Sequence, residues 1–597
     1  MKLKSWIWLV FVTGTVWAEK PNVLFIAIDD LRNFVGCFGY DQAITPNMDR
    51  LAEQSTIFLN AHCAAPMCGP SRSALMTGVQ PYHSGVYGFA DWRKAPGLQD
   101  AVPLNLHFKN HGYYTMSGGK IYHGNTHRAG DWDEVYCKAN HKEGTWGEEE
   151  IRQEDRSLKK YFGMKVCGPS DLPESAFHDT MTADMAVEKL QQEYDKPWFL
   201  AVGFTKPHLS WIVPRKYFDL YDPEKLKLPE VLENDIADTP EAAQFASYQV
   251  HALGVDTEPG GARRMLHAYL ATITYMDAQL GKVLDAFEKR ADADNTVVIL
   301  WSDHGWHLGE KQCWSKFTLW DESTRNPLMI SAPGLRKKQT CTKPAQLVDM
   351  YPTLVELCGL PLPKSQLDGH SLLPLMKNPE ADWRWPAITC NGRDSYSLTF
   401  EDWKYNRFFD GSEELYDLVN DPYCWTNLVG VSEFSEKKQR LAVFLPKESH
   451  KNFSDGKEWM LWLEDYPRMA EWREEMTEIH QELARTGRVN NQIFRRKCRA
   501  AIEADQKSET KAESLVVQDS KRDQILAEEG SVPKWFKKMD VDGDLRVTTD
   551  EWVECNRRQA LIDGRDFNED KCLGNMKRRD ADGDEVVTLD EYVQSIK

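Results

Sequence analysis

The side chains best suited to chemistry include a thiol, a hydroxyl and a guanidinium in the run CGPSR, from Cys68 to Arg72. A thiol in such a place ordinarily serves as half of a disulfide, a zinc ligand, a thiolate nucleophile or a small apolar side chain. The zinc option fails, because His62 and Cys63 do not give zinc-finger spacing with Cys68. The other three options stay open at this point.

Carboxylates and an imidazole follow two apolar runs. Asp29 and Asp30 come directly after PNVLFIAI, and Asp303 and His304 come after NTVVILWS. A single such pair is more often a helix cap, but the carboxyl ends of parallel strands meet at one edge of a sheet. Together these side chains predict a site for a single hard cation. A soft thiolate is a poor ligand there, so Cys68 either lies elsewhere or is not a thiol.

Buried strands and intervening helices must position these groups. The segments at 23–28, 198–208 and 295–310 are apolar strands that end in polar clusters, and 263–289 is helix-like. This alternation predicts an α/β fold with a mainly parallel central sheet and helices on both faces. From about residue 385 the chain becomes aromatic and turn-rich, and WKYNRFFDGSEELYDL contains a hairpin signal, so 385–430 predicts a smaller antiparallel sheet.

The termini of the 597-residue chain differ in character from its centre. Residues 1–18 read as a signal peptide, which predicts an exported protein, periplasmic or secreted, and no later apolar run is long enough for a membrane span. We expect a catalytic α/β domain at 19–384 and an antiparallel subdomain at 385–454. The charge-rich segment 455–530 predicts a helical connector, or simply a solvated linker, before a module at 531–597.

Two acidic loops near the C-terminus have the spacing of an EF-hand pair. DVDGDLRVTTDE (540–551) and DADGDEVVTLDE (580–591) place oxygen-bearing side chains at the calcium-binding positions. Leu545 and Glu585 stand where glycine is expected, which leaves calcium affinity open. The predicted ligands are Asp540, Asp542, Asp544, Thr548 and Glu551 in the first loop, and Asp580, Asp582, Asp584, Thr588 and Glu591 in the second.

Composition limits the partners and the redox chemistry. A net charge of −19 disfavours nucleic acid or an anionic membrane as the main partner, although one pocket can still be positive and take an anion. Thirteen cysteines in an exported protein predict disulfides, and twelve remain to pair if Cys68 has another fate.

The run CGPSRSALMTG resembles the CxPSRxxxxTG signature of type I sulfatases. In that family the cysteine is converted during export by the formylglycine-generating enzyme, and the resulting aldehyde is carried as its hydrate, whose oxygens suit calcium. Further segments resemble the iduronate-2-sulfatase group: DDLR at 29, SGGKIYH at 117, TKPH at 205, SDHGWHLGE at 302, QLVDMYPTL at 346 and ELYDLVNDP at 414.

The resemblance implies an alkaline-phosphatase-like fold and an enzyme that hydrolyses sulfate esters of a sulfated sugar or polysaccharide. A hydroxyl of the hydrate would attack sulfur, and the second hydroxyl would then expel sulfate. Two alternatives stay open: a phosphodiesterase or phosphonate hydrolase, and an inert calcium-binding scaffold protein. By resemblance, the calcium ligands are Asp29, Asp30, formylglycine from Cys68, Asp303 and His304; Arg72, Lys120 and His123 hold the hydrate; His208 and Lys316 face the sulfate ester.

Overall fold

The computed structural model describes residues 20–124, 130–138, 160–161, 165–248, 260–453, 546–548, 552 and 586–588. The predicted signal peptide, the charged connector and most of the predicted EF-hand ligands lie outside these residues. The chain divides into two units, 1–490 and 491–597, which are described separately. Within the described residues, no helix combines the length and the apolar character that crossing a bilayer requires.

An eight-stranded sheet forms the centre of the first unit. Its strand order is β12-β2-β11-β10-β1-β8-β4-β5, and every neighbouring pair is parallel except those that include β11. The predicted class, α/β with a mostly parallel sheet, is therefore confirmed. The strands are β1 Asn22–Asp29, β2 Thr56–Phe58, β4 Tyr114–Gly119, β5 Glu134–Lys138, β8 Trp198–Pro207, β10 Thr296–Ser302, β11 Leu328–Ser331 and β12 Gln339–Cys341.

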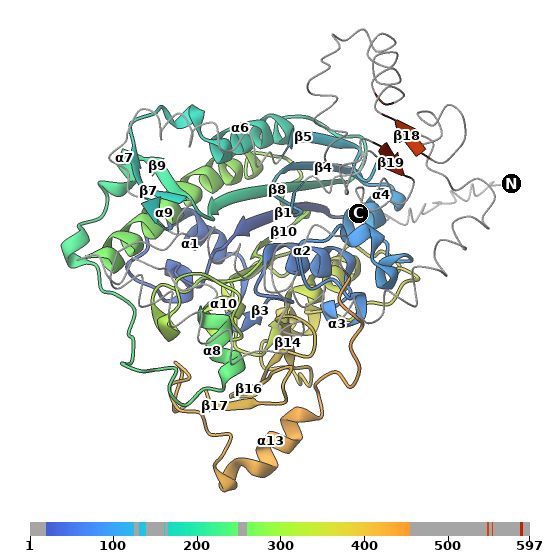
Figure 1. Cartoon of the computed structure of the whole chain (residues 1–597). Helices are drawn as coiled ribbons and strands as arrows, with labels where there is room; N and C mark the ends of the chain where they lie inside the picture. Colours follow the sequence, from blue (N-terminus) through green and yellow to red (C-terminus); the bar gives the residue numbers. More distant parts are fainter. Residues whose placement is uncertain are drawn as a thin grey trace, which may run out of the picture. The chain divides into compact units, whose positions relative to one another are not determined.

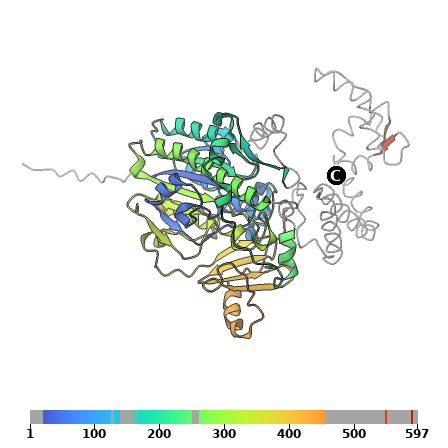
Figure 2. The same cartoon turned by 90° about the vertical axis from the view of Figure 1, so that its left-hand side faces the viewer.

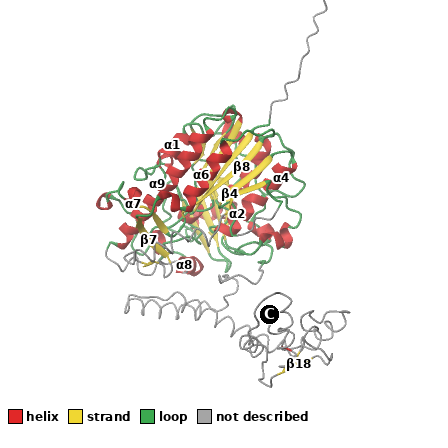
Figure 3. Cartoon of the chain, turned by 90° about the horizontal axis from the view of Figure 1, so that it is seen from above, coloured by secondary structure: helices red, strands yellow, loops and turns green. Residues whose placement is uncertain are grey.

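Strand β1 shows why the apolar runs are continuous. Leu24 and Ile26 point into one apolar cluster, while Val23 and Phe25 point into a second one on the opposite face. Both faces of a parallel sheet are covered by helices, so alternate residues have no solvent side on which to be polar. Helices α6 and α9 lie on one side of the central strands and α2 and α4 on the other (Figures 1 and 3).

The helices vary from single turns to the long α9, whose mostly buried face packs on α6 and β8. They are α1 Pro46–Ala52, α2 Cys68–Thr77, α3 Pro81–Ser84, α4 Leu104–Asn110, α6 His178–Leu190, α7 Arg215–Phe218, α8 Glu241–Tyr248, α9 Gly261–Phe287, α10 Asp321–Thr324, α11 Met350–Leu357, α12 Leu373–Lys377 and α13 Ser435–Ala442.

A second, four-stranded antiparallel sheet is formed by β14 Ala387–Cys390, β15 Tyr396–Phe400, β16 Trp403–Arg407 and β17 Glu413–Asp417. Its strands are the yellow and orange ribbons near α13 in Figure 2. The predicted hairpin turn lies between β16 and β17, where Gly411 has φ +82, a backbone conformation that favours glycine. The smaller antiparallel sheet is therefore also confirmed.

Short ladders complete the architecture. β3 Ala61–His62 pairs with β13 Ala345–Gln346, and β6 Lys160–Tyr161, β7 Lys165–Ser170 and β9 Trp211–Pro214 form a three-stranded sheet. In the second unit, β18 Arg546–Thr548 pairs antiparallel with β19 Val586–Thr588. That ladder joins the same three positions of the two acidic loops predicted from the sequence.

The disulfides predicted from the cysteine count are not found among the described residues. Most of the cysteines there carry free thiols, and many are buried in the apolar clusters, where a thiol packs as a small hydrophobe. Those with free thiols are Cys37, Cys63, Cys68, Cys137, Cys313, Cys341, Cys358, Cys390 and Cys424.

Candidate active site

Four parallel strands bring the predicted site residues to one edge of the sheet. Asp29 is the last residue of β1. The residues that come directly after β4, β8 and β10 are Lys120, His208 and Asp303, respectively. Cys68 is the first residue of α2. Its Sγ and one ligand atom from each of Asp29, Asp303 and His304 all lie within 4.8 Å of one another. A second such group within the described residues contains Asp29, Asp30, Cys68 and His208.

Arg72 holds the acidic residues in place from one turn further along α2. Its Nε donates to Asp303 Oδ2 at 2.7 Å and its Nη2 donates to Asp29 Oδ1 at 3.2 Å. Its Nη1 donates to the carbonyl oxygens of Lys120 and Ile121 at 2.6 and 3.0 Å. The guanidinium is fully buried, so these four hydrogen bonds serve as a fixed connection between β1, β10 and the end of β4.

Two buried lysines neutralise the carboxylates. Lys120 Nζ contacts Asp29 Oδ2, and Lys316 Nζ donates to Asp30 Oδ1 at 2.6 Å. Lys316 Nζ also lies 3.2 Å from Cys68 Sγ. Although burial opposes a charged ammonium, Asp29 and Asp30 raise the pKa of Lys120 and of Lys316 respectively, and both remain cationic.

His304 faces Cys68 with its unprotonated nitrogen. Its Nδ1 lies 3.1 Å from Gly305 O, a partner that can only accept, so this nitrogen carries the proton. Nε2 is then the atom 3.3 Å from Cys68 Sγ, with a lone pair available for a cation. Burial lowers the pKa of His304, which favours this neutral form.

The pKa values of the neighbouring carboxyl groups Asp29 and Asp30 shift in opposite directions. Burial opposes ionisation of Asp29, but Lys120 and Arg72 outweigh it and hold the pKa of that carboxyl well below its usual value. Burial raises the pKa of Asp30, and Asp29 adds to this. Asp30 Oδ2 is buried and has no hydrogen-bond partner, an arrangement that is costly unless another group satisfies the oxygen.

The unmodified thiol of Cys68 is itself poorly placed for nucleophilic chemistry. Burial raises the pKa of Cys68 to about 12, with Asp29 contributing further, so the thiol is neutral near pH 7. A neutral thiol is a weak nucleophile and a weak ligand.

The two other predicted histidines occupy different places. His208 Nε2 lies 3.9 Å from Asp30 Oδ2, and its Nδ1 donates to Leu209 O at 2.6 Å, so Nε2 is directed toward the acidic cluster. His123 is half-buried and packs against Phe89, with ring centroids 4.5 Å apart. Phe89 in turn lies beside Gly69 at the start of α2.

Asp179 supports this site although the sequence did not single it out. It lies in the first turn of α6, is buried, and its Oδ1 and Oδ2 accept the backbone N–H groups of Thr205 and Lys206 at 2.9 and 2.8 Å. Its carboxylate thereby fixes the C-terminal end of β8, directly before His208. The contact spans at least 26 residues, and no local motif marks it.

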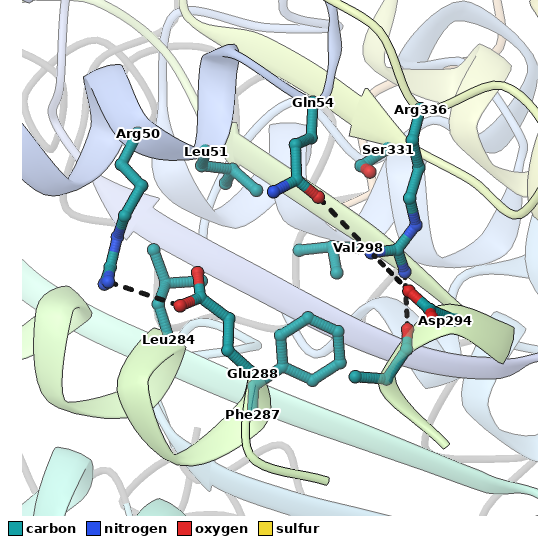
Figure 4. Close-up of a pocket in the computed structure, with 11 residues that line it drawn as sticks. Arg50, Leu51, Gln54, Leu284, Phe287, Glu288, Asp294, Val298, Ser331 and Arg336 are labelled. Carbon is teal, nitrogen blue, oxygen red and sulfur yellow. Dashed lines mark hydrogen bonds and ion pairs between the residues drawn. The ribbon is translucent and has the colours of Figure 1, made fainter. Parts of the chain in front are cut away.

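A cavity of about 300 Å³ lies near the start of β10, the end opposite Asp303 (Figure 4). Arg50 and Arg336 flank it, and each pairs with an acidic residue: Arg50 with Glu288 at 3.3 Å, Arg336 with Asp294 at 3.8 Å. Because both guanidinium groups have acidic partners, the cavity shows no net preference for an anion.

Comparisons with known proteins agree with this geometry. Residues 21–360 match the family model "Sulfatase", and residues 309–451 match "N-sulphoglucosamine sulphohydrolase, C-terminal". A sulfatase of Formosa agariphila is 35% identical over 447 residues, covering 72% of this chain and 87% of the relative. Iduronate 2-sulfatase of Mus musculus is 30% identical over 407 residues, covering 59% and 71%.

Solved structures share the fold. A structure of a protein in complex with its substrate D-glucosamine-2-N,6-O-disulfate superposes with a TM-score of 0.57 at 22% identity, covering 72% of this chain and 97% of that chain. A phosphonate monoester hydrolase of Agrobacterium radiobacter gives a TM-score of 0.59 at 22% identity, covering 71% and 94%.

The fold is thus the alkaline-phosphatase-like α/β architecture expected from the sequence, with a buried acidic and histidine cluster at its strand ends. The chain belongs to the sulfatase family, and it is a sulfuric ester hydrolase.

Proposed function

We propose that this sulfatase removes sulfate from a sulfated sugar, with Ca²⁺ and a formylglycine derived from Cys68 at its active site. The set of donor atoms is the observation that supports a metal site here. Asp30 Oδ2 is buried without a hydrogen bond, and beside it lie carboxylates, the Nε2 lone pair of His304 and the position of Cys68. Oxygen-rich sets of this kind suit calcium.

Formylglycine fits the same set better than cysteine does. Its hydrate would present oxygen atoms where the thiol now lies among hard ligands, and it would supply the nucleophilic hydroxyl of sulfate transfer. Asp29, Asp30, Asp303 and His304 would hold the cation. Ca²⁺, when bound, would neutralise charge on the sulfate oxygens.

The protein's own side chains would carry the remaining tasks. Lys316 would bind the anionic sulfate, and its position between Asp30 and Cys68 supports this. His208 turns Nε2 toward the cluster, and we assign it the proton for the departing sugar oxygen. Arg72 and Lys120 would keep the reacting residue and Asp29 aligned. His123, held against Phe89, would act at the margin of the site.

The sugar substrate rests on the relatives. Among them are iduronate 2-sulfatases and an "Ulvan-active sulfatase" of Formosa agariphila, and a structural neighbour was solved with a sulfated glucosamine. Phosphonate monoester hydrolases also share the fold, so turnover of a phosphonate monoester is the relevant comparison. We expect the sulfate ester to be the better substrate.

The second unit is proposed to be an EF-hand pair. The β18–β19 ladder supports this, because it joins the seventh to ninth positions of the two acidic loops, with Arg546 opposite Thr588. Export through the N-terminal segment 1–18 is likewise proposed from its sequence, as is maturation by the formylglycine-generating enzyme.

The decisive experiment is peptide mass measurement on protein produced with the formylglycine-generating enzyme, combined with sulfate release. We expect an aldehyde at residue 68, activity lost on chelation and restored by Ca²⁺, and no activity in Cys68→Ala. Cys63→Ala, at a nearby buried thiol, is the matched control and should keep its activity. Full activity with an unmodified thiol at residue 68 would refute the proposal.

A further inference from the structure

A second cluster of reactive groups lies at the end of β5, on the edge strand of the large sheet. Cys137 Sγ is 3.9 Å from His178 Nε2 and 3.6 Å from Thr182 Oγ1, both on the first turns of α6. His178 Nδ1 is in turn 3.8 Å from Asp179 Oδ1. Thiol, imidazole and carboxylate therefore form a chain of neighbouring groups, and Cys137 as a residue is half-buried rather than enclosed.

The surroundings of Cys137 favour a thiolate. Burial opposes the charge, but His178, the Thr182 hydroxyl and the backbone of Gly119 together lower the pKa of Cys137. Burial likewise opposes a charge on His178, yet Asp179 and Cys137 raise its pKa to about 10. The start of α6 adds the positive end of a helix dipole.

Other ionisable groups near Cys137 do not reverse this preference. Tyr136 and Glu134 lie on the same strand; burial, Cys137 and Glu134 all push the Tyr136 pKa upward, so its phenol stays neutral. Cys37 provides a contrast within the same chain. It too is half-buried, but burial and Asp49 raise the pKa of its thiol, so it stays protonated.

We propose that Cys137 and His178 form a nucleophilic thiolate–imidazolium pair that undergoes exchange with small disulfides, separate from sulfate ester hydrolysis. The thiolate attacks one sulfur of a low-molecular-weight disulfide. A new S–S bond forms as the old one breaks, and the departing thiolate takes a proton from water. His178 stays protonated throughout, and the half-buried position restricts the site to small reagents.

The test is peptide-resolved labelling of the native full-length protein with limiting iodoacetamide from pH 6.5 to pH 9. Cys137 should be alkylated at least tenfold faster than Cys37 at pH 6.5, and its rate should change little with pH while that of Cys37 rises. Hydroxyethyl disulfide should form a mixed disulfide at Cys137 under the same conditions. Equal pH profiles for the two thiols, or Cys137 already paired with another cysteine, would overturn the proposal.

Substitutions test the role of the imidazole. His178→Gln should slow labelling of Cys137 at pH 6.5 about tenfold and restore a steep rise with pH. His267→Gln, at a half-buried histidine bonded to Phe218 O, is the control and should leave Cys137 labelling unchanged. If His178→Gln does not fold, Thr182→Val removes the hydroxyl with little change of shape and should slow labelling two- to threefold. No effect in the folded variant tested would refute the pair.

Discussion

At the scale of single residues, some side chains of the candidate site both make structural hydrogen bonds and face the acidic cluster. Asp303 accepts from Arg72 through Oδ2 and from the Asp30 backbone through Oδ1, while also belonging to the acidic cluster. His208 combines a backbone hydrogen bond with a ring nitrogen that faces Asp30. At Asp303 a substitution therefore separates chemistry from folding only when it keeps the shape of the side chain, and at His208 the comparison of two substrates separates them.

Asp303→Asn should lower turnover of an aryl sulfate by at least about 10-fold, because it removes a negative charge from a cluster that we propose binds Ca²⁺. Steady-state kinetics at saturating calcium measure this, with a thermal melt to verify folding. Asp294→Asn makes the same change at a fully exposed carboxylate and should be neutral. Near-normal turnover in Asp303→Asn would contradict the assignment.

His208→Ala should reduce turnover of a sulfated sugar far more than turnover of nitrophenyl sulfate. A sugar alkoxide needs a proton to depart whereas a nitrophenolate does not, and general-acid help is worth about 10²- to 10⁴-fold. Parallel kinetics on the two substrates give the comparison. Equal losses on both would mean that His208 binds the sulfate group, and the acid would then have to be Lys316 or His123.

At the scale of secondary-structure elements, the sequence predicted the strands that carry the site better than the contacts that brace it. β1, β8 and β10 are buried on both faces, so their apolar runs are continuous and end visibly at polar residues. β2 and β12, the last two strands at one side of the sheet, have three residues each and left no such pattern. Asp179 was missed because its partners are distant in the chain and are backbone N–H groups, which no side-chain motif records.

Asp179→Ala should show the same pattern of activity loss on the two substrates as His208→Ala, but smaller. Without the carboxylate, two half-buried N–H groups lose their acceptors and the end of β8, directly before His208, is less well fixed. We expect about a 10-fold loss of kcat on a sulfated sugar and a smaller loss on nitrophenyl sulfate. Asp184→Ala removes a largely exposed carboxylate on the same helix and is the control. The same loss on both substrates would indicate a purely structural role.

At the scale of the whole molecule, the calcium sites that we propose fall in two different units. The family model matches residues 21–360, and the candidate site lies within that range. A chain ending after residue 490 should therefore keep turnover of small sulfate esters within about twofold while losing the calcium sites proposed for the second unit. Activity assays with calorimetric calcium titration would measure both. A folded but inactive truncation would make the second unit part of the catalytic structure.

Stability should fall on mild acidification because of buried neutral histidines. Burial lowers the pKa of His307 to about 3, and the ring bonds Thr318 Oγ1 at 2.7 Å. Between about pH 6.5 and pH 3 the unfolded chain binds a proton at this histidine that the folded chain does not. The free energy of unfolding should decline by about 1.4 kcal/mol per pH unit from this residue alone.

Urea unfolding of the wild type and of His307→Gln from pH 7 to pH 4.5 would test this. The variant should show a shallower pH dependence, even if it is less stable overall. His450→Gln, at an exposed position, should keep the original slope. An unchanged slope in His307→Gln would show that other groups control acid stability.

The burial of α2 has a consequence for the order of events in biosynthesis. Cys68 is 2% exposed, and Ser71 and Arg72 beside it are fully enclosed. An enzyme that must grip this segment and oxidise its thiol has no access to it once the sheet has closed over it. The conversion of Cys68 that we propose would therefore have to precede folding, while the segment is still extended. A chain that folds first would be permanently inactive, and adding the converting enzyme afterwards would not rescue it.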